Sequence, residues 1–263
     1  VDRRQRQMCI RDRYKSTGLA YFNRTIVIVA KLLRKQVEMD LNAMIKTVCI
    51  DAIPLVLALV LHEIMHGYMA LKNGDPTAKL AGRLTLNPLD HISLLGTVIF
   101  PLVLLILHFP FLIGWAKPVP VNPTRFHNYR KGMREVAASG PIVNLVMLFI
   151  WAFLLVLMEL MSEKGWSNTL VSFITDMSYF GIMINGVLGI FNLIPIPPLD
   201  GSRIVDSFLP PAASRRYNAL APYGILIVLC LMYAGFFTLI TPIIRWISNL
   251  ALGLWGSLLG LLF

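Results

Sequence analysis

The sequence predicts an all-α polytopic membrane protein, and three observations lead to that fold class. Hydrophobic residues make up 56% of the 263 residues and charged residues 14%, against roughly 45–50% and 25% in soluble domains. Several apolar runs approach the ~20 residues that a helix needs to cross a bilayer. A His-Glu-x-x-His motif stands near the end of the first long run, and ionisable groups at such positions are usually functional. We expect about five to six hydrophobic segments in one membrane-embedded domain, residues 39–263.

The first 38 residues differ from the rest of the chain. They hold ten Lys/Arg and three Asp/Glu, a net charge of +7, whereas residues 39–263 carry +3. Residues 1–13 resemble a translated sequencing adapter, and Met39 stands shortly before the first long apolar run. We therefore predict that residues 1–38 are a non-native or upstream extension; the alternative is a basic amphipathic arm on the membrane surface. The basic excess does not indicate nucleic-acid binding, and we expect no nucleic-acid partner.

The hydrophobic segments follow one another along the chain. Membrane segments are expected over residues 47–69, 94–113, 135–161, 179–199, 223–244 and 246–263. The second of these contains Pro101 and Pro110, which interrupt a regular helix, so we expect it to be re-entrant or strongly tilted. Arg83–Leu86 alternates in polarity before a turn, which predicts a short extended segment close to the site.

The His-Glu-x-x-His motif occupies residues 62–66. Residues four apart share one face of a helix, so His62 and His66 can bind one metal ion and Glu63 can activate its water. A catalytic zinc usually has three protein ligands. Asp200 is the best-placed third ligand, because the three prolines just before it must unwind the chain at membrane depth. The alternative for this carboxylate is a structural role, either at a helix end or in an ion pair such as one with Arg203. The histidines outside the motif are His91, His108 and His127.

Three motifs together resemble the site-2 protease family (peptidase family M50) of intramembrane zinc metalloproteases. They are H-E-x-x-H at 62–66, G-P-x-x-N at 140–144 and N-L-I-P-I-P-P-L-D-G at 192–201. Residues 82–89 and 114–123 resemble the compact bacterial branch of that family. The resemblance implies one catalytic Zn²⁺ bound by His62, His66 and Asp200, with Glu63 as general base and Asn192 near the scissile bond. It also implies a transmembrane protein substrate, cleaved within or near a transmembrane helix in regulated intramembrane proteolysis.

The charge distribution predicts an orientation. His62 and Asp200 both lie toward the C-terminal ends of their segments, so these two segments should run parallel, and one segment between them should not cross. With residues 94–113 as that segment, one side of the membrane receives 11 of the 14 Lys/Arg that follow Met39, and the facing loop at 162–178 receives one. The positive-inside rule then places the active-site end at the cytoplasm, most naturally of a prokaryotic inner membrane.

Two other functions use the same residues. In a transporter or channel, His62, Glu63 and Asp200 would form a proton or metal pathway, although no inverted repeat of the kind found in transporters is visible. A catalytically inactive relative would act as a scaffold, but the motif glutamate is intact. No feature selects a particular substrate or an oligomeric state.

Overall fold

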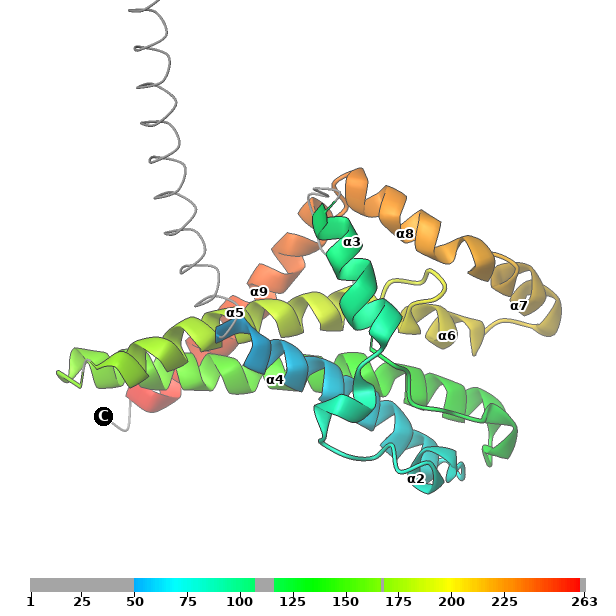
Figure 1. Ribbon diagram of the computed structural model, residues 1–263, viewed down its shortest axis with the longest axis horizontal. Helices are drawn as coiled ribbons and strands as arrows, with labels where there is room; N and C mark the ends of the chain where they lie inside the picture. Colours follow the sequence, from blue (N-terminus) through cyan, green and yellow to red (C-terminus); the bar gives the residue numbers. More distant parts are fainter. Residues whose placement is uncertain (1–49, 107–115, 167, 261–263) are drawn as a thin grey trace, which may run out of the picture. The chain divides into compact units, whose positions relative to one another are not determined.

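Helices dominate the part of the chain that the computed structural model describes, residues 50–106, 116–166 and 168–260 (Figure 1). Five helices in these ranges are long and apolar enough to cross a membrane, and no β-strand occurs there. They are Ile50–Lys72, Tyr129–Glu163, Thr169–Asn192, Pro211–Tyr233 and Phe237–Gly260. The predicted all-α polytopic fold is confirmed. The expected extension, residues 1–38, lies outside the described residues.

The longest helix, α4 (Tyr129–Glu163), begins earlier than predicted. Asn128 caps it, since its side-chain oxygen accepts a hydrogen bond from the Lys131 N–H at 3.0 Å. We expected this segment from residue 135, but the cap extends the helix through the basic residues before that point. Its 35 residues measure about 52 Å, well beyond the ~30 Å hydrocarbon core. The polar first turns can therefore project from the membrane.

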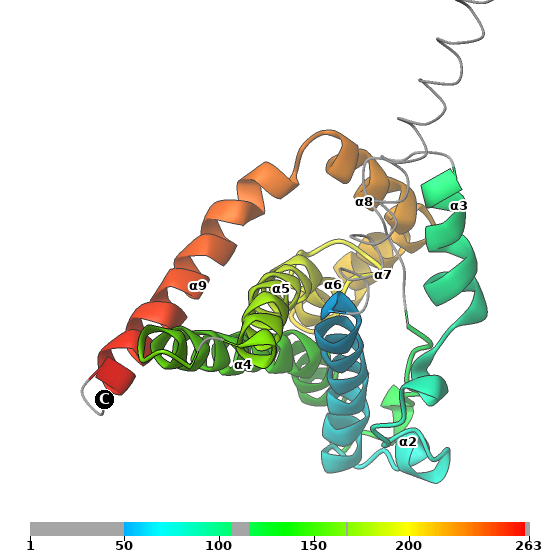
Figure 2. The same ribbon diagram turned by 60° about the vertical axis from the view of Figure 1, so that its left-hand side comes forward.

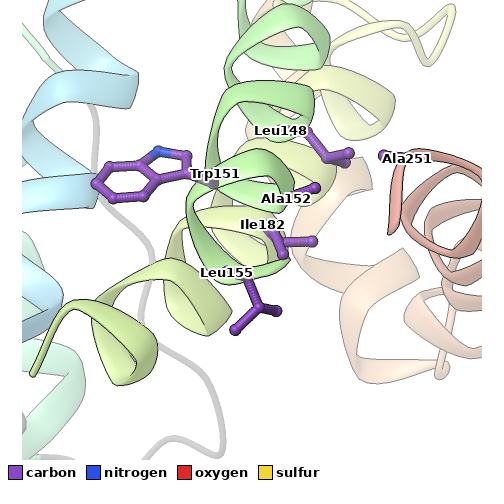
Figure 3. Close-up of a cluster of buried hydrophobic side chains, with 6 residues drawn as sticks. All are labelled: Leu148, Trp151, Ala152, Leu155, Ile182 and Ala251. Atoms are coloured by element: carbon purple, nitrogen blue, oxygen red, sulfur yellow. The ribbon is translucent and has the colours of Figure 1, made fainter. Parts of the chain in front are cut away.

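Side chains from three helices form the main hydrophobic cluster (Figure 3). Helix α4 packs against α5 (Thr169–Asn192) and α9 (Phe237–Gly260), and Figure 2 shows α9 meeting α4 with its C-terminal half. Trp151 fits because α5 has a glycine opposite: a Cβ on Gly181 would lie 2.4 Å from the indole ring. Close packing of this kind, rather than exclusion of water, drives helix association in lipid. The cluster consists of Leu148, Trp151, Ala152, Leu155, Ile182 and Ala251.

The opposite face of α4 carries an apolar stripe that protein does not cover. Ile142, Val146 and Ile150 recur every four residues and are 55%, 51% and 45% exposed, whereas Asn144 and Leu148 on the packed face are fully buried. Such a stripe is unfavourable in water but suits contact with lipid. The pattern agrees with an integral membrane protein.

The connection between α4 and α5 is shorter than predicted. We expected a polar loop over residues 162–178 and a segment over 179–199, and these boundaries are wrong, because α4 ends at Glu163 and α5 begins at Thr169. Asn168 accepts a hydrogen bond from the Val171 N–H at 2.9 Å, so the polar residues after it form the first turns of α5. Helix α5 ends at Asn192, and the proline-rich stretch after it leaves the helix, as predicted.

The C-terminal helices are divided at a different place from the predicted one. Helix α8 (Gly224–Tyr233) continues the candidate span that α7 (Pro211–Asn218) begins, and α9 runs through the expected boundary near residue 245. The chain instead turns at Gly235, whose φ is 81°, with the Phe236 N–H donating to the Leu231 carbonyl. This is a helix-ending turn that glycine permits. The predicted segments 223–244 and 246–263 are therefore wrong in their boundaries.

Two predicted features follow the first helix. Residues Leu94–Ile99 form a π-helix that continues into α3 (Phe100–Ile106), and the rest of the expected re-entrant segment lies outside the described residues, so its re-entry stays a prediction. Residues 83–86 are free of helix, as expected. They lie against the first helix, because a Cβ on Gly67 would be 2.7 Å from Leu84 Cδ2. The non-helical segment therefore adjoins the motif.

The first helix and α5 both run antiparallel to α4. His62 lies against Asn144 while His66 lies against Val136, so residue numbers rise along the first helix as they fall along α4. Helices α4 and α5 are consecutive, packed together and joined by a short connection, which makes them antiparallel as well. The first helix and α5 therefore run parallel, as predicted and as Figure 1 shows.

Candidate metal centre

The two motif histidines meet Asp200, which is 138 residues beyond His62. Asp200 Oδ2 lies 3.1 Å from His62 Nε2 and 3.2 Å from His66 Nε2. The helix Ile50–Lys72 places the two imidazoles one turn apart on one face, with their ring centroids 4.6 Å apart. Asp200 opens α6 (Asp200–Asp206), directly after the proline-rich stretch. Among the described residues this is the group of three ligand-type side chains that could hold a metal ion.

Hydrogen bonds at the far side of each imidazole determine which nitrogen is protonated. His62 Nδ1 lies 2.6 Å from Asn144 Oδ1, and His66 Nδ1 lies 2.7 Å from the Val136 carbonyl oxygen. Both oxygens only accept hydrogen bonds, so both Nδ1 atoms are donors. With Nδ1 engaged in this way, the Nε2 atom of each ring is the one that faces Asp200 and is left to bind a metal ion. Three lone-pair donors converge on one point, which is the arrangement a metal cation requires.

The spacing of these atoms fits zinc. Tetrahedral zinc with bonds of ~2.0–2.1 Å separates neighbouring ligand atoms by roughly 3.3–3.4 Å. The two measured separations, 3.1 and 3.2 Å, agree with this within ordinary tolerance, and all three ligand atoms lie within 4.8 Å of one another. Two histidines and one carboxylate also leave a fourth position open, as in catalytic zinc sites. The group therefore fits a catalytic zinc ion.

A buried asparagine pair holds the His62 ring in place. The Asn144 amide donates to the Ala58 carbonyl at 3.1 Å and to Asn185 Oδ1 at 3.0 Å, and the Asn185 amide donates to the Gly181 carbonyl at 2.9 Å. Both asparagines are fully buried, so these bonds fix the direction of the Asn144 oxygen. Asn144 belongs to the G-P-x-x-N motif, whereas Asn185 lies in none of the motifs; an asparagine inside an apolar helix was the available signal for it.

The close approach of α4 to the two motif histidines depends on Gly140. A Cβ at this position would lie 2.6 Å from His66 Nε2 and 2.7 Å from His62 Cε1. These distances are far below van der Waals contact, so any side chain would displace the imidazoles. The glycine of the G-P-x-x-N motif therefore forms one wall of the metal centre.

Glu63 is held by a backbone segment from a distant part of the chain. The Val119 N–H donates to Glu63 Oε2 at 2.9 Å. Val119 lies between two prolines, which have no N–H to offer, so it is the donor in this stretch. The contact engages one carboxylate oxygen and orients the other. The sequence of residues 114–123 resembles a motif of the family branch, but nothing in it predicts their position beside the glutamate.

The same segment is anchored by Asp75, in the turn that follows the first helix. Asp75 is fully buried and accepts hydrogen bonds from the Asn122 N–H at 2.6 Å and the Thr77 N–H at 3.0 Å. Burial raises the pKa of Asp75, but the hydrogen bonds from Thr77 and Asn122 outweigh it and leave the pKa below its ordinary value. From the sequence, this aspartate is recognisable only as part of a helix-ending turn.

The remaining candidates occupy other positions. The Asn192 amide donates to the Leu188 carbonyl of its own helix at 3.0 Å, so its place near the scissile bond stays a prediction. His91 is buried with Nε2 2.9 Å from the Thr85 carbonyl oxygen, and His108 lies outside the described residues. Asp200 is paired with the two histidines, and no ion pair joins it to Arg203 among the described residues.

Comparison with known proteins agrees with this geometry. The model of peptidase family M50 matches residues 51–234. "Putative zinc metalloprotease YwhC" of Bacillus subtilis is 40% identical over 182 residues, covering 68% of this chain and 78% of that protein. "Putative zinc metalloprotease Rip2" of Mycolicibacterium smegmatis is 29% identical over 195 residues, covering 74% and 68% respectively. No solved structure matches the chain.

Family membership favours the protease over the transporter and scaffold alternatives. The matched region contains the H-E-x-x-H motif, both buried asparagines and Asp200. The protein is thus a membrane-embedded zinc metalloprotease with a ligand group that fits a catalytic zinc. The chain belongs to peptidase family M50, the site-2 protease family.

Proposed function

We propose that this protein hydrolyses a peptide bond within or near a transmembrane helix of a membrane-protein substrate. The observation that carries the proposal is the position of His62, Glu63 and His66 inside a 23-residue apolar helix, packed against the apolar α4. A site on such a helix is most readily reached from within the bilayer. The proposal includes regulated intramembrane proteolysis as the biological role and His62, His66 and Asp200 as the zinc ligands.

The residues of the chain take separate roles in the reaction. A zinc ion held by His62, His66 and Asp200 would supply Lewis acidity toward the scissile carbonyl and the attacking water. Glu63 accepts the proton of that water and returns it to the leaving amine. The Val119 N–H keeps one Glu63 oxygen engaged, which leaves the other free to face the water. Asn192 donates to the developing oxyanion after its side chain turns away from α5.

The substrate must unwind before it is cut, because a helix buries its own carbonyls in hydrogen bonds. Residues 83–86 are free of helix and adjoin the motif, so they can receive an extended substrate strand by strand addition. Proline substitutions across 83–86 would remove the N–H donors that this pairing needs. Cleavage that survived them would disprove the strand-addition step.

The active-site end faces the cytoplasm in this proposal. Basic residues cluster at that end: Lys72 ends the motif helix, Lys79 and Arg83 follow it, and Arg130 and Arg134 lie at the start of α4. Positive charge is retained on the cytoplasmic side of prokaryotic inner membranes. Cysteines introduced at the exposed positions 79 and 125 should be labelled from the same, cytoplasmic side, and labelling from opposite sides would contradict the orientation.

The proposed cleavage is tested with the purified protein in lipid nanodiscs. The probes are synthetic 20-residue apolar helices with a central Gly-Pro, flanked by lysines and analysed by mass spectrometry, together with an unstructured soluble peptide. We expect the wild type to cut inside the apolar helix and Glu63→Gln to leave it intact while retaining zinc. Cutting of the soluble peptide alone, or equal cutting by both proteins, would overturn the proposal.

A further inference from the structure

A small cavity lies beside the metal centre, and one cation lines it. Its volume is about 210 Å³, roughly that of one large side chain. Its lining residues are Val121, Pro123, Met133, Val136 and Arg203. Four of the five are apolar, so the cavity offers an apolar wall and a single guanidinium.

The cavity is lined by α4, α6 and the segment before α4, and each of these contacts or carries a proposed metal ligand or the proposed base. The Val136 carbonyl is the acceptor for His66 Nδ1 at 2.7 Å. Arg203 follows Asp200 by three residues on α6, which puts both on the same side of that helix. Val121 belongs to the backbone segment whose Val119 N–H binds Glu63. A group seated in the cavity would therefore lie next to the reacting centre.

The charge of Arg203 is not compensated within the described part of the chain. Its guanidinium has no hydrogen bond or ion pair to any described residue, and the residue is exposed. The acidic side chains of α6 and of the first turns of α4 have other partners: Asp200 with the two motif histidines, Asp206 with the Asn218 amide, and Glu135 with Asn73 and Lys131. An anion entering the cavity would meet an available cation.

We propose that this cavity is a substrate subsite that takes an acidic side chain, Asp or Glu, close to the cleaved bond. The apolar wall suits the methylene stem, and the guanidinium suits the carboxylate, which it can bind through two parallel hydrogen bonds. The inference rests on the proposed protease function and adds a substrate preference to it. Because Arg203 is partly screened by solvent, we expect about a tenfold preference for Glu over Gln at the favoured position.

The test measures binding, so that it does not depend on turnover. Glu63→Gln protein in nanodiscs is titrated with fluorescent apolar helical peptides in which a single Glu, or a matched Gln, is moved stepwise along the sequence. Arg203→Gln and Arg203→Glu are compared in the same background. Arg216→Gln, an exposed arginine on α7, is the matched control for loss of one positive charge. Zinc content is measured for every variant to confirm an intact site.

We expect one Glu position to bind about tenfold more tightly than Gln, with Arg203→Gln removing and Arg203→Glu reversing that preference. Arg216→Gln should leave it unchanged. Equal binding of all Glu and Gln peptides, or a preference that Arg203→Gln retains, would overturn the subsite. A preference that appears only for a free C-terminal carboxylate would also overturn it, since the anion would then be a product terminus. If binding depended on Arg203 but the wild type cleaved none of the helical peptides, the subsite would be supported and the proposed cleavage of transmembrane helices would be rejected.

Discussion

Replacing Gly140 by alanine should weaken zinc binding sharply while leaving the helices intact. The new Cβ would lie 2.6 Å from His66 Nε2 and 2.7 Å from His62 Cε1, whereas ordinary contact begins near 3.4 Å. The imidazoles or α4 must therefore move by about 0.7–0.8 Å. Zinc ligands tolerate displacements of about 0.2 Å.

The rings have little freedom to retreat. Each is held at Nδ1 by a short hydrogen bond, 2.6 Å to Asn144 and 2.7 Å to Val136. Moving a ring breaks its bond, and loss of such supporting bonds costs about 10–100-fold in metal affinity. Alanine itself favours helix by about 1 kcal/mol over glycine, so the helix propensity of α4 does not fall. We expect zinc affinity to drop by about 10–100-fold or more, and peptide cleavage to fall with it.

The assay is zinc affinity by competition with a fluorescent chelator in nanodiscs, with circular dichroism as the check on folding. Gly253→Ala is the matched control, because it makes the same change in the apolar helix α9, where an added Cβ meets nothing within 4 Å. Its zinc affinity should equal that of the wild type. If Gly140→Ala binds zinc as tightly as Gly253→Ala does, the close approach of α4 to the imidazoles is refuted.

Other contacts give further expected outcomes. Asp200→Ala should lose most of its zinc, whereas Glu63→Gln should keep about one ion per chain and lose cleavage by about 10²–10⁴-fold; metal analysis with the peptide assay checks both. Val119→Pro removes the N–H that Glu63 accepts from, so kcat should fall with zinc content unchanged, and an unaltered kcat would contradict that orienting role. Because the folded-state pKa of Asp75 lies below its ordinary 3.8, its contribution to stability is fully present above that pH and is lost as pH falls through the lower folded value. Between pH 3 and 7, the unfolding temperature should therefore fall less on the acid side in Asp75→Asn than in the wild type. Equal falls in the two proteins would show that Asp75 does not cause the acid-side loss of stability.

The features predictable from sequence are those set by local geometry. His62 and His66 share a face because a helix repeats every 3.6 residues, and three prolines before Asp200 cannot continue a helix. The parallel direction of the first helix and α5 was also predictable, because His62 and Asp200 lie toward the C-terminal ends of their segments and must meet at the same depth in the membrane. Helix boundaries were less predictable. A single hydrogen bond to Asn168 sets the start of α5, and one backbone angle, at Gly235, sets the turn before α9.

The sequence by itself determined the fold class, because apolar length acts locally, and its motifs were enough to propose the metal ligands and the base. Only the tertiary structure decided what supports them: the Asn144 bond to His62, the Val119 bond to Glu63, the approach of Gly140 and the cavity at Arg203. The first two contacts join residues 82 and 56 positions apart. Such pairings depend on how whole helices and loops pack against one another, and no periodicity within a single segment records that packing.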